Sequence, residues 1–96
     1  MTEQEKSLKL SELMGWRLYE NEGKFFTHDM GCLCPYNELP RGSGRAQFAA
    51  ILLRFPEVMA RFVGVKNEYE ITMLPWNEPT QANILDEILR MNGVDV

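Results

Sequence analysis

Cysteine is scarce in this 96-residue sequence, which contains only Cys32 and Cys34, with one residue between them. That spacing seldom allows an unstrained disulfide, and two cysteines are too few for the disulfide framework of a small secreted protein. The first six residues contain no apolar stretch of the signal-peptide type. We therefore expect the protein to work in a reducing, cytoplasmic environment.

Long apolar runs and an excess of basic residues are also missing. No segment approaches the ~20 consecutive apolar residues that a membrane-spanning helix needs, so we expect no membrane partner. Ten Lys and Arg against fourteen Asp and Glu give a net charge of −4. Non-specific nucleic-acid binding instead relies on a basic surface that displaces phosphate counterions, so the composition predicts no direct nucleic-acid partner.

The sequence contains no recognisable catalytic set. His28 is the single histidine, and no serine lies in a nucleophile-elbow context. The neighbours His28 and Asp29 do not make a triad by adjacency, because triads are assembled in space. Cys32 or Cys34 paired with His28 is the remaining route to an activated thiolate. We predict that the protein is not an enzyme and carries no cofactor.

His28, Asp29, Cys32 and Cys34 are also four residues of metal-ligand type within seven positions. Structural zinc sites pair two ligand knuckles separated by a dozen or more residues, and this sequence has only one such cluster. Cysteines buried in an apolar loop are the simpler interpretation. We expect no metal site, and a zinc-stabilised structural protein is the third of three functional hypotheses.

What is present is the pattern of one α+β domain over residues 1–96, with an antiparallel sheet of about three strands packed with three to four helices. Thr2 and Glu5 fit a capping box and Gly15 supplies a left-handed stop, which predicts a helix over residues 3–14. Alternation predicts strands over 16–19, 24–27 and 68–74, with residues 21–23 as a hairpin loop. Residues 28–42 show no period and are expected to form a long irregular loop.

Three further helices follow from apolar spacing and caps. Ser43 is a candidate N-cap for a central, most buried helix that ends near Arg54. Pro56 suits the first turn of a helix over 56–64, although a strand over 58–65 is the rival interpretation. Asn77 is a candidate N-cap for the last helix. Its apolar stripe consists of Ile84, Leu85, Ile88 and Leu89.

The segment Arg41-Gly42-Ser43-Gly44-Arg45 leads into the central helix. Amides at a helix N-terminus, small residues and two arginines together favour an anion. The segment lacks the lysine and spacing of a P-loop. It supports a hypothesis of a binding module for a phosphorylated or nucleotide-like ligand at Ser43, Gly44 and Arg45, against the simpler interpretation of a helix start with solvated arginines.

Tyr36 differs from the other aromatic residues because it lies in a stretch without period, between Pro35 and Pro40. Amphipathic rings in such surface loops often anchor a protein partner; a structural turn residue is the competing interpretation. If the loop is exposed, Tyr36, Glu38, Arg41 and Arg45 would face a partner together. These four residues form the predicted partner-binding set.

Residues 10–16, Leu-Ser-Glu-Leu-Met-Gly-Trp, and residues 76–83, Trp-Asn-Glu-Pro-Thr-Gln-Ala-Asn, resemble the two ends of small bacteriophage and prophage proteins of the phage α-β-α sandwich family. Members of that family carry a Leu-Met-Gly-Trp helix end and a Trp-Asn-Pro-x-Thr element before an amphipathic helix. The chain departs from this pattern at Glu78, where the family usually has proline. The resemblance implies a phage or prophage origin and expression in a bacterial cytoplasm, and it carries over no catalytic residue.

The leading functional hypothesis is therefore a phage- or prophage-encoded, non-enzymatic protein that binds a bacterial host protein, for example to inhibit a defence component. The ligand module at Ser43, Gly44 and Arg45 is the alternative.

Overall fold

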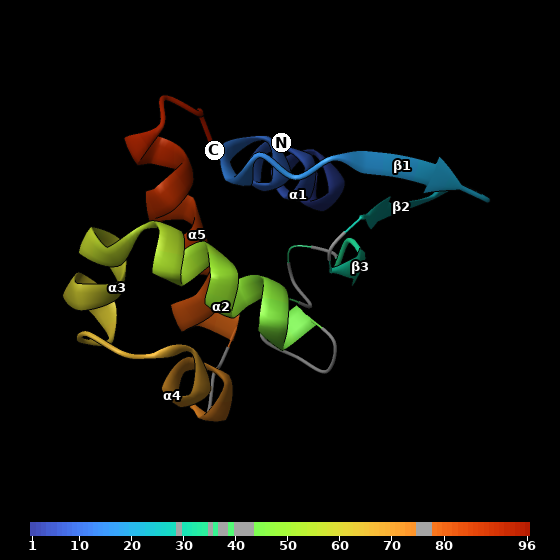
Figure 1. The fold of residues 1–96 in the computed structure, drawn as a ribbon. Coiled ribbons are helices and arrows are strands. Elements are labelled where there is room, and N and C mark those ends of the chain that lie inside the picture. Colours follow the sequence, from blue (N-terminus) through green and yellow to red (C-terminus); the bar gives the residue numbers. More distant parts are fainter. Residues whose placement is uncertain (29, 35, 37–38, 40–43, 75–77) are drawn as a thin grey trace.

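Five helices and a small antiparallel sheet make up the part of the chain that the computed structural model describes, which is residues 1–28, 30–34, 36, 39, 44–74 and 78–96. Figure 1 shows the helices gathered into one body, from which the hairpin of β1 and β2 projects. The α+β class and the antiparallel sheet are thus confirmed. In chain order the elements are α1 (Glu3–Met14), β1 (Leu18–Asn21), β2 (Lys24–Thr27), β3 (Gly31–Cys32), α2 (Gly44–Arg54), α3 (Pro56–Phe62), α4 (Glu68–Met73) and α5 (Glu78–Met91).

Helix α1 begins and ends where its capping residues predict. The Thr2 hydroxyl accepts a hydrogen bond from the Glu5 amide at 3.1 Å, and the Glu5 carboxylate accepts one from the Thr2 amide at 3.5 Å. Gly15 has a φ of 72°, and its amide bonds the carbonyl of Glu12. A left-handed residue of this kind ends a helix at low cost only when it is glycine.

The sheet has the order β1-β2-β3, with both pairs antiparallel. The hairpin loop consists of Glu22 and Gly23, whose φ values of 51° and 77° are both positive. Two-residue loops with this backbone match the right-handed twist of the strands that they join. Consequently β1 starts and ends two residues later than predicted, and Asn21 pairs with Lys24 inside the ladder.

The predicted strand over residues 68–74 is wrong, because α4 occupies this segment. Asn67 accepts a hydrogen bond from the Glu70 amide at 2.8 Å, and the Glu70 carboxylate accepts one from the Asn67 amide at 3.2 Å. This second capping box starts a helix. The alternating positions do not share a face, since Ile71 is buried whereas Tyr69 is 71% exposed. The third strand is β3 instead, in a stretch expected to be irregular.

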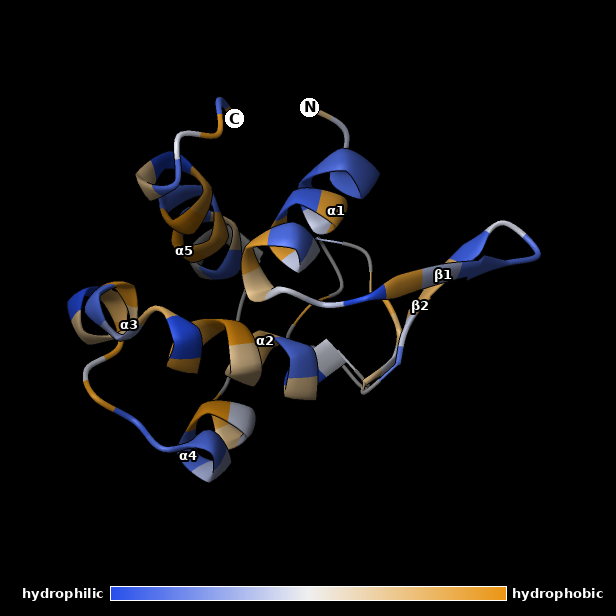
Figure 2. Cartoon of the chain, turned by 45° about the horizontal axis from the view of Figure 1, so that its top comes forward, coloured by the Kyte–Doolittle hydropathy of each residue, from blue (hydrophilic) through white to orange (hydrophobic). Residues whose placement is uncertain are grey.

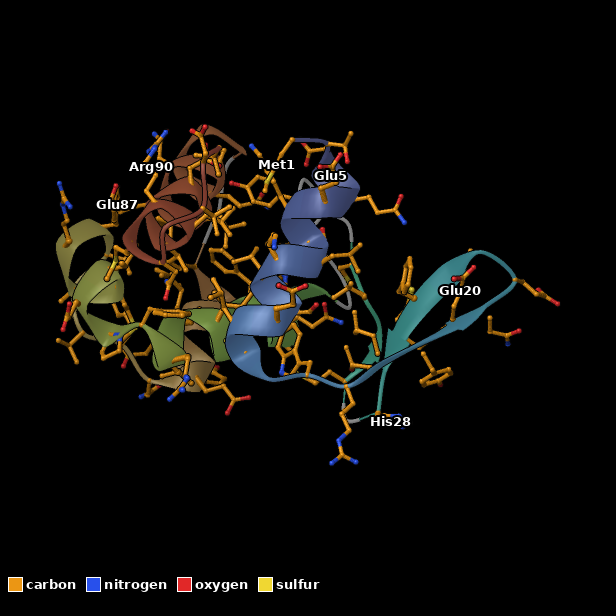
Figure 3. All side chains as sticks on the ribbon, turned by 90° about the horizontal axis from the view of Figure 1, so that it is seen from above. Met1, Glu5, Glu20, His28, Glu87 and Arg90 are labelled. Carbon is orange, nitrogen blue, oxygen red and sulfur yellow. The ribbon has the colours of Figure 1, made fainter. Side chains whose placement is uncertain are left out.

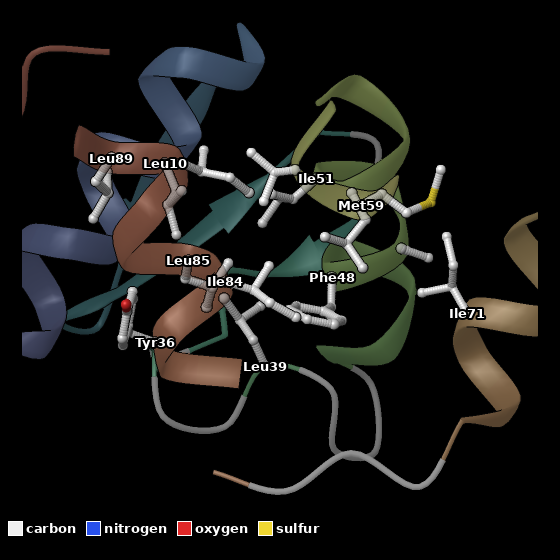
Figure 4. Packing of buried hydrophobic residues seen from close by; sticks show 14 of the residues in the cluster. Leu10, Tyr36, Leu39, Phe48, Ile51, Met59, Ile71, Ile84, Leu85 and Leu89 are labelled. Atoms are coloured by element: carbon white, nitrogen blue, oxygen red, sulfur yellow. The ribbon is translucent and has the colours of Figure 1, made fainter. Parts of the chain in front are cut away.

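The helix over residues 56–64 is confirmed, with Pro56 in the first turn of α3. The candidate caps Ser43 and Asn77 lie outside the described residues. Helix α2 lies at the centre of the body, in contact with α1, α3 and α4. Figure 4 shows its buried side chains packed against those of α5. The core of α2 and α5 comprises Phe48, Ala49, Ile51, Leu52, Ile84, Leu85, Ile88 and Leu89.

Three of the described residues between β3 and α2 are buried. Cys34, Tyr36 and Leu39 are 7%, 3% and 2% exposed. Gln47 of α2 is fully buried; its Oε1 accepts the Cys34 amide at 3.1 Å and its Nε2 donates to the Cys32 carbonyl. These are the two backbone groups that one residue of a parallel neighbouring strand would engage. The side chain of Gln47 therefore completes the outer edge of β3 and holds it against α2.

We expect Gln47→Met to lower the free energy of unfolding by about 2–3 kcal/mol, because the substitution leaves a buried amide and a carbonyl without partners. Urea unfolding measures the change. The matched control is Gln4→Met, since Gln4 is exposed on α1 and surface substitutions usually stay within about 0.5 kcal/mol. Equal stability of the two variants would contradict the interior pairing.

Candidate functional site

An open groove of about 500 Å³ lies between the N-terminal half of α1 and the sheet. Phe25 of β2 and Leu33, the residue after β3, supply large apolar side chains to its lining, and Glu3, Gln4 and Ser7 come from α1. The Leu33 amide donates to the Phe25 carbonyl at 2.8 Å, which extends the pairing of β2 and β3 by one step. Residues opposite each other in an antiparallel pair lie on the same face, so Phe25 and Leu33 form one apolar floor.

The two walls of the groove are fixed to each other. The Ser7 hydroxyl lies 3.0 Å from the Glu3 carbonyl within α1 and 3.4 Å from the Cys34 carbonyl on the other wall. Ser7 and Cys34 are both buried, and the same stretch is held to α2 through Gln47. The groove is therefore a preformed feature of the fold.

The rim of the groove on the α1 side is acidic. Glu3 lines it, beside Gln4 and Ser7 of the same helix. Glu20 of β1 lies opposite Phe25 in the register and therefore on the groove face of the hairpin. Lys24 borders the groove at the hairpin turn, although the register pairs it with Asn21, on the other face of the hairpin. Apolar floor and acidic rim together suit a partner that offers an apolar side chain flanked by basic ones.

Tyr36 is not an exposed anchor, so this part of the predicted partner-binding set is wrong. Its hydroxyl donates to a carboxylate oxygen of Asp86 and lies 3.2 Å from the Ala82 carbonyl, both on α5. Lys6 of α1 lies 3.3 Å from the same Asp86 oxygen and 4.8 Å from the centre of the Tyr36 ring. The backbone carbonyl of Tyr36 accepts a hydrogen bond from the buried Gln81. Tyr36 thus bonds α5 and lies against Lys6 of α1.

Of the remaining members of the two predicted sets, the structure describes Gly44 and Arg45. Glu38, Arg41 and Ser43 lie outside the described residues. Gly44 is buried at the start of α2, and the exposed Arg45 donates to the Thr72 carbonyl of α4 at 3.3 Å. Arg45 therefore contributes to holding α2 and α4 together, whereas Tyr36 bonds α5.

The cysteine and histidine cluster does not form a metal site in the described part of the chain, where no group of three or more His, Cys, Asp or Glu could hold an ion; Asp29 lies outside that part. Cys32 is exposed, Cys34 is buried, and they form no disulfide. His28 contacts the ring of Tyr19 on the hairpin.

Across the described helices, none combines the length and apolar character that crossing a membrane requires.

Sequence reasoning missed Phe25 and Leu33 as site residues. The sequence predicts correctly that Phe25 lies in a strand. Its pairing with Leu33 depends on β3, which is too short to give a periodic pattern. The capping box predicts α1 and the alternation predicts the hairpin, but neither pattern indicates that α1 and the hairpin face each other.

Comparison of the chain with protein-family models, curated proteins and solved structures gives no match. The resemblance of the two ends to the phage α-β-α sandwich family stays a prediction. Trp76 and Asn77, which carry part of it, lie outside the described residues.

We expect Tyr36→Phe to reduce the free energy of unfolding by about 1–3 kcal/mol, because it removes a hydroxyl that bonds a carboxylate inside the protein. Tyr69→Phe is the matched control, since the Tyr69 side chain is on the surface of α4. Thermal or urea unfolding of the two variants gives the comparison. A Tyr36→Phe protein as stable as the control would show that the hydroxyl is not bonded to Asp86.

Burial and the hydrogen bond with Asp86 raise the pKa of the Tyr36 hydroxyl well above its usual value. The unfolded chain releases this proton near pH ~10, whereas the folded protein retains it. The unfolded state then binds fewer protons, so the free energy of unfolding falls as pH rises above ~10, by up to about 1.4 kcal/mol per unit. We expect the stability difference between wild type and Tyr36→Phe to shrink above pH ~10 and to be constant below it; parallel curves would contradict this.

Proposed function

We propose that the protein is a small, non-enzymatic binding domain that recognises a bacterial host protein by receiving a segment of it in the groove between α1 and the sheet. The observation that carries the proposal is the preformed groove with its apolar floor, Phe25 and Leu33, and the acidic residues around it. Its volume of about 500 Å³ falls within the range of pockets that bury organic ligands or large side chains.

The apolar floor supplies affinity for one or two anchoring side chains of the partner. Protein interfaces concentrate their binding energy in a few such anchors that are well packed and shielded from water. Phe25 and Leu33 are half-buried, so they keep surface for a partner while the sheet holds them in place. Because the walls of the groove are fixed, little conformational entropy is lost on binding.

The acidic rim selects the kind of segment. Glu3 and Glu20 favour lysine or arginine beside the apolar anchor, and the net charge of −4 repels acidic competitors. Complementary rim charges act mainly on the association rate and are screened by salt. Binding through this groove should therefore weaken as ionic strength rises.

The resemblance of the chain ends to phage and prophage proteins suggests which kind of partner the groove binds. We propose that the partner is a protein of the bacterial host, and that binding of its basic segment in the groove inhibits this host protein. A component of host defence is the specific candidate. Inhibition of this kind requires tight binding and no chemistry, in keeping with the prediction that the protein is not an enzyme.

We expect a photo-crosslinking amino acid at position 4, beside the groove, to give a discrete adduct in bacterial cells. The same amino acid at position 54 is the control, because Arg54 is exposed on α2. Leu33→Asp should weaken adduct formation about tenfold or more, because it places a carboxylate on the apolar floor. Leu53→Asp, at an exposed leucine of α2, should leave it unchanged.

Charge reversal gives an independent arm of this experiment. Glu3→Lys should weaken the adduct from position 4 and reduce its dependence on salt, since one attractive rim charge is removed. Adducts that form equally well from positions 4 and 54, or that persist in Leu33→Asp, would refute recognition through the groove.

A further inference from the structure

The hairpin of β1 and β2 has a second face, directed away from the groove. Because side chains alternate along a strand, Glu20 and Phe25 occupy the groove face, whereas the opposing pair Tyr19 and Phe26 occupies the other. Figure 3 shows Glu20 and His28 on opposite sides of the hairpin. Figure 2 shows the hydrophilic tip of the hairpin extending well away from the helices, so both faces are open to partners.

Three rings form a continuous row on this second face. Tyr19 stacks on Phe26 with 5.5 Å between ring centres and an angle of 20° between ring planes. The ring of His28 lies 5.1 Å from that of Tyr19 at an angle of 38°. Tyr19 is 47% exposed and His28 is exposed as well. Folding does not require a ring as exposed as that of Tyr19, which leaves it available to stack on a ligand.

The charges that accompany the rings are positive. Arg17 lies two residues before Tyr19, so alternation directs it to the same face, and Lys24 lies opposite Asn21 at the turn. Both cations are exposed. Glu20, the one acidic residue among the paired positions of the hairpin, is on the groove face instead. Although the whole chain is acidic, this face combines two cations with three rings and no carboxylate among positions 17, 19, 21, 24, 26 and 28.

We propose that this aromatic face of the hairpin binds single-stranded nucleic acid. Bases would stack on Tyr19 and His28, while Arg17 and Lys24 would contact the flanking phosphates. Exposed aromatic rings beside cations are the general means of holding single strands, because every base offers a flat π-face. A duplex is disfavoured, because its bases are already stacked inside and cannot reach the rings.

The proposal revises the expectation, drawn from net charge alone, that nucleic acid is not a partner. The alternation of side chains along the two strands places different charges on the two faces of the hairpin. A ligand interacts mainly with the charges of the face that it contacts, because salt screens the more distant charges. With only two cations, binding should be modest and strongly salt-dependent. For a single strand that contacts both, the slope of log K against log salt should be about −1.4.

Fluorescence anisotropy with labelled single-stranded DNA, single-stranded RNA and duplex DNA tests this surface on the intact protein. We expect the protein to bind single strands in preference to the duplex. Comparing the affinities for the two single-stranded probes shows whether RNA or DNA is the preferred ligand. Tyr19→Ala should weaken binding by roughly tenfold, within the range for loss of one stacked base, whereas Tyr19→Phe keeps a ring and should bind like wild type.

Matched controls separate this face from general surface effects. Tyr69→Ala removes an exposed tyrosine of α4, and Arg54→Ala removes an exposed arginine of α2; both should bind like wild type. Arg17→Ala should make the salt slope about 0.7 less steep. Circular dichroism confirms that each variant is folded.

Absence of single-strand binding at low salt, equal binding of duplex, or an equal loss in Tyr19→Ala and Tyr69→Ala would overturn the proposal. Capture of an acidic peptide in place of single strands would overturn it as well. Failure here leaves the groove untouched, because Leu33→Asp alters only the groove face and Tyr19→Ala only the aromatic face.

Discussion

The pairing of Gln47 with the backbone of Cys32 and Cys34 is the contact on which the rest of the structure depends. A side-chain amide of α2 takes the place of a fourth strand and satisfies the outer edge of β3 inside the protein. An unprotected edge would be open to pairing with another chain. Because β3 is fixed to α2, the projecting hairpin is fixed as well. The groove then has one wall from the sheet and one from α1, with the Ser7 hydroxyl between them.

Buried backbone groups of Cys34 and Tyr36 find their partners in the same way. Buried backbone groups must be hydrogen-bonded, and here glutamines of two helices provide the partners. Gln47 accepts from the Cys34 amide, and Gln81 donates to the Tyr36 carbonyl. The described residues contain no buried side-chain nitrogen or oxygen without a hydrogen-bond partner.

Local signals in the sequence predicted much of the helical structure. The capping box of Thr2 and Glu5, the stop at Gly15 and the helix start at Pro56 each act through neighbours within one turn, and the structure confirms them. The segment after Asn67 shows the limit of this reasoning. Over six residues, an alternating pattern and a helical one are hard to distinguish, and the capping box determines the outcome.

The site could not be predicted in the same way, because its determinants are distant in sequence. Tyr36 finds its partners Ala82 and Asp86 at separations of 46 and 50 residues, so a local pattern suggested exposure where packing imposes burial. Phe25 and Leu33 meet through a ladder with the two-residue strand β3. Alternation does predict that Tyr19 and Glu20 take opposite faces, and this separation gives the hairpin its two chemical characters.

Hydrogen exchange of the Cys34 amide is the most direct test of its pairing with Gln47. Measured residue by residue by NMR, it reports whether this amide is bonded inside the protein or open to water. We expect the Cys34 amide to exchange as slowly as that of Leu52 in the core of α2. Exchange as fast as that of the exposed hairpin tip at Glu22 would show that the stretch is not held by Gln47, and the preformed groove would then lose its basis.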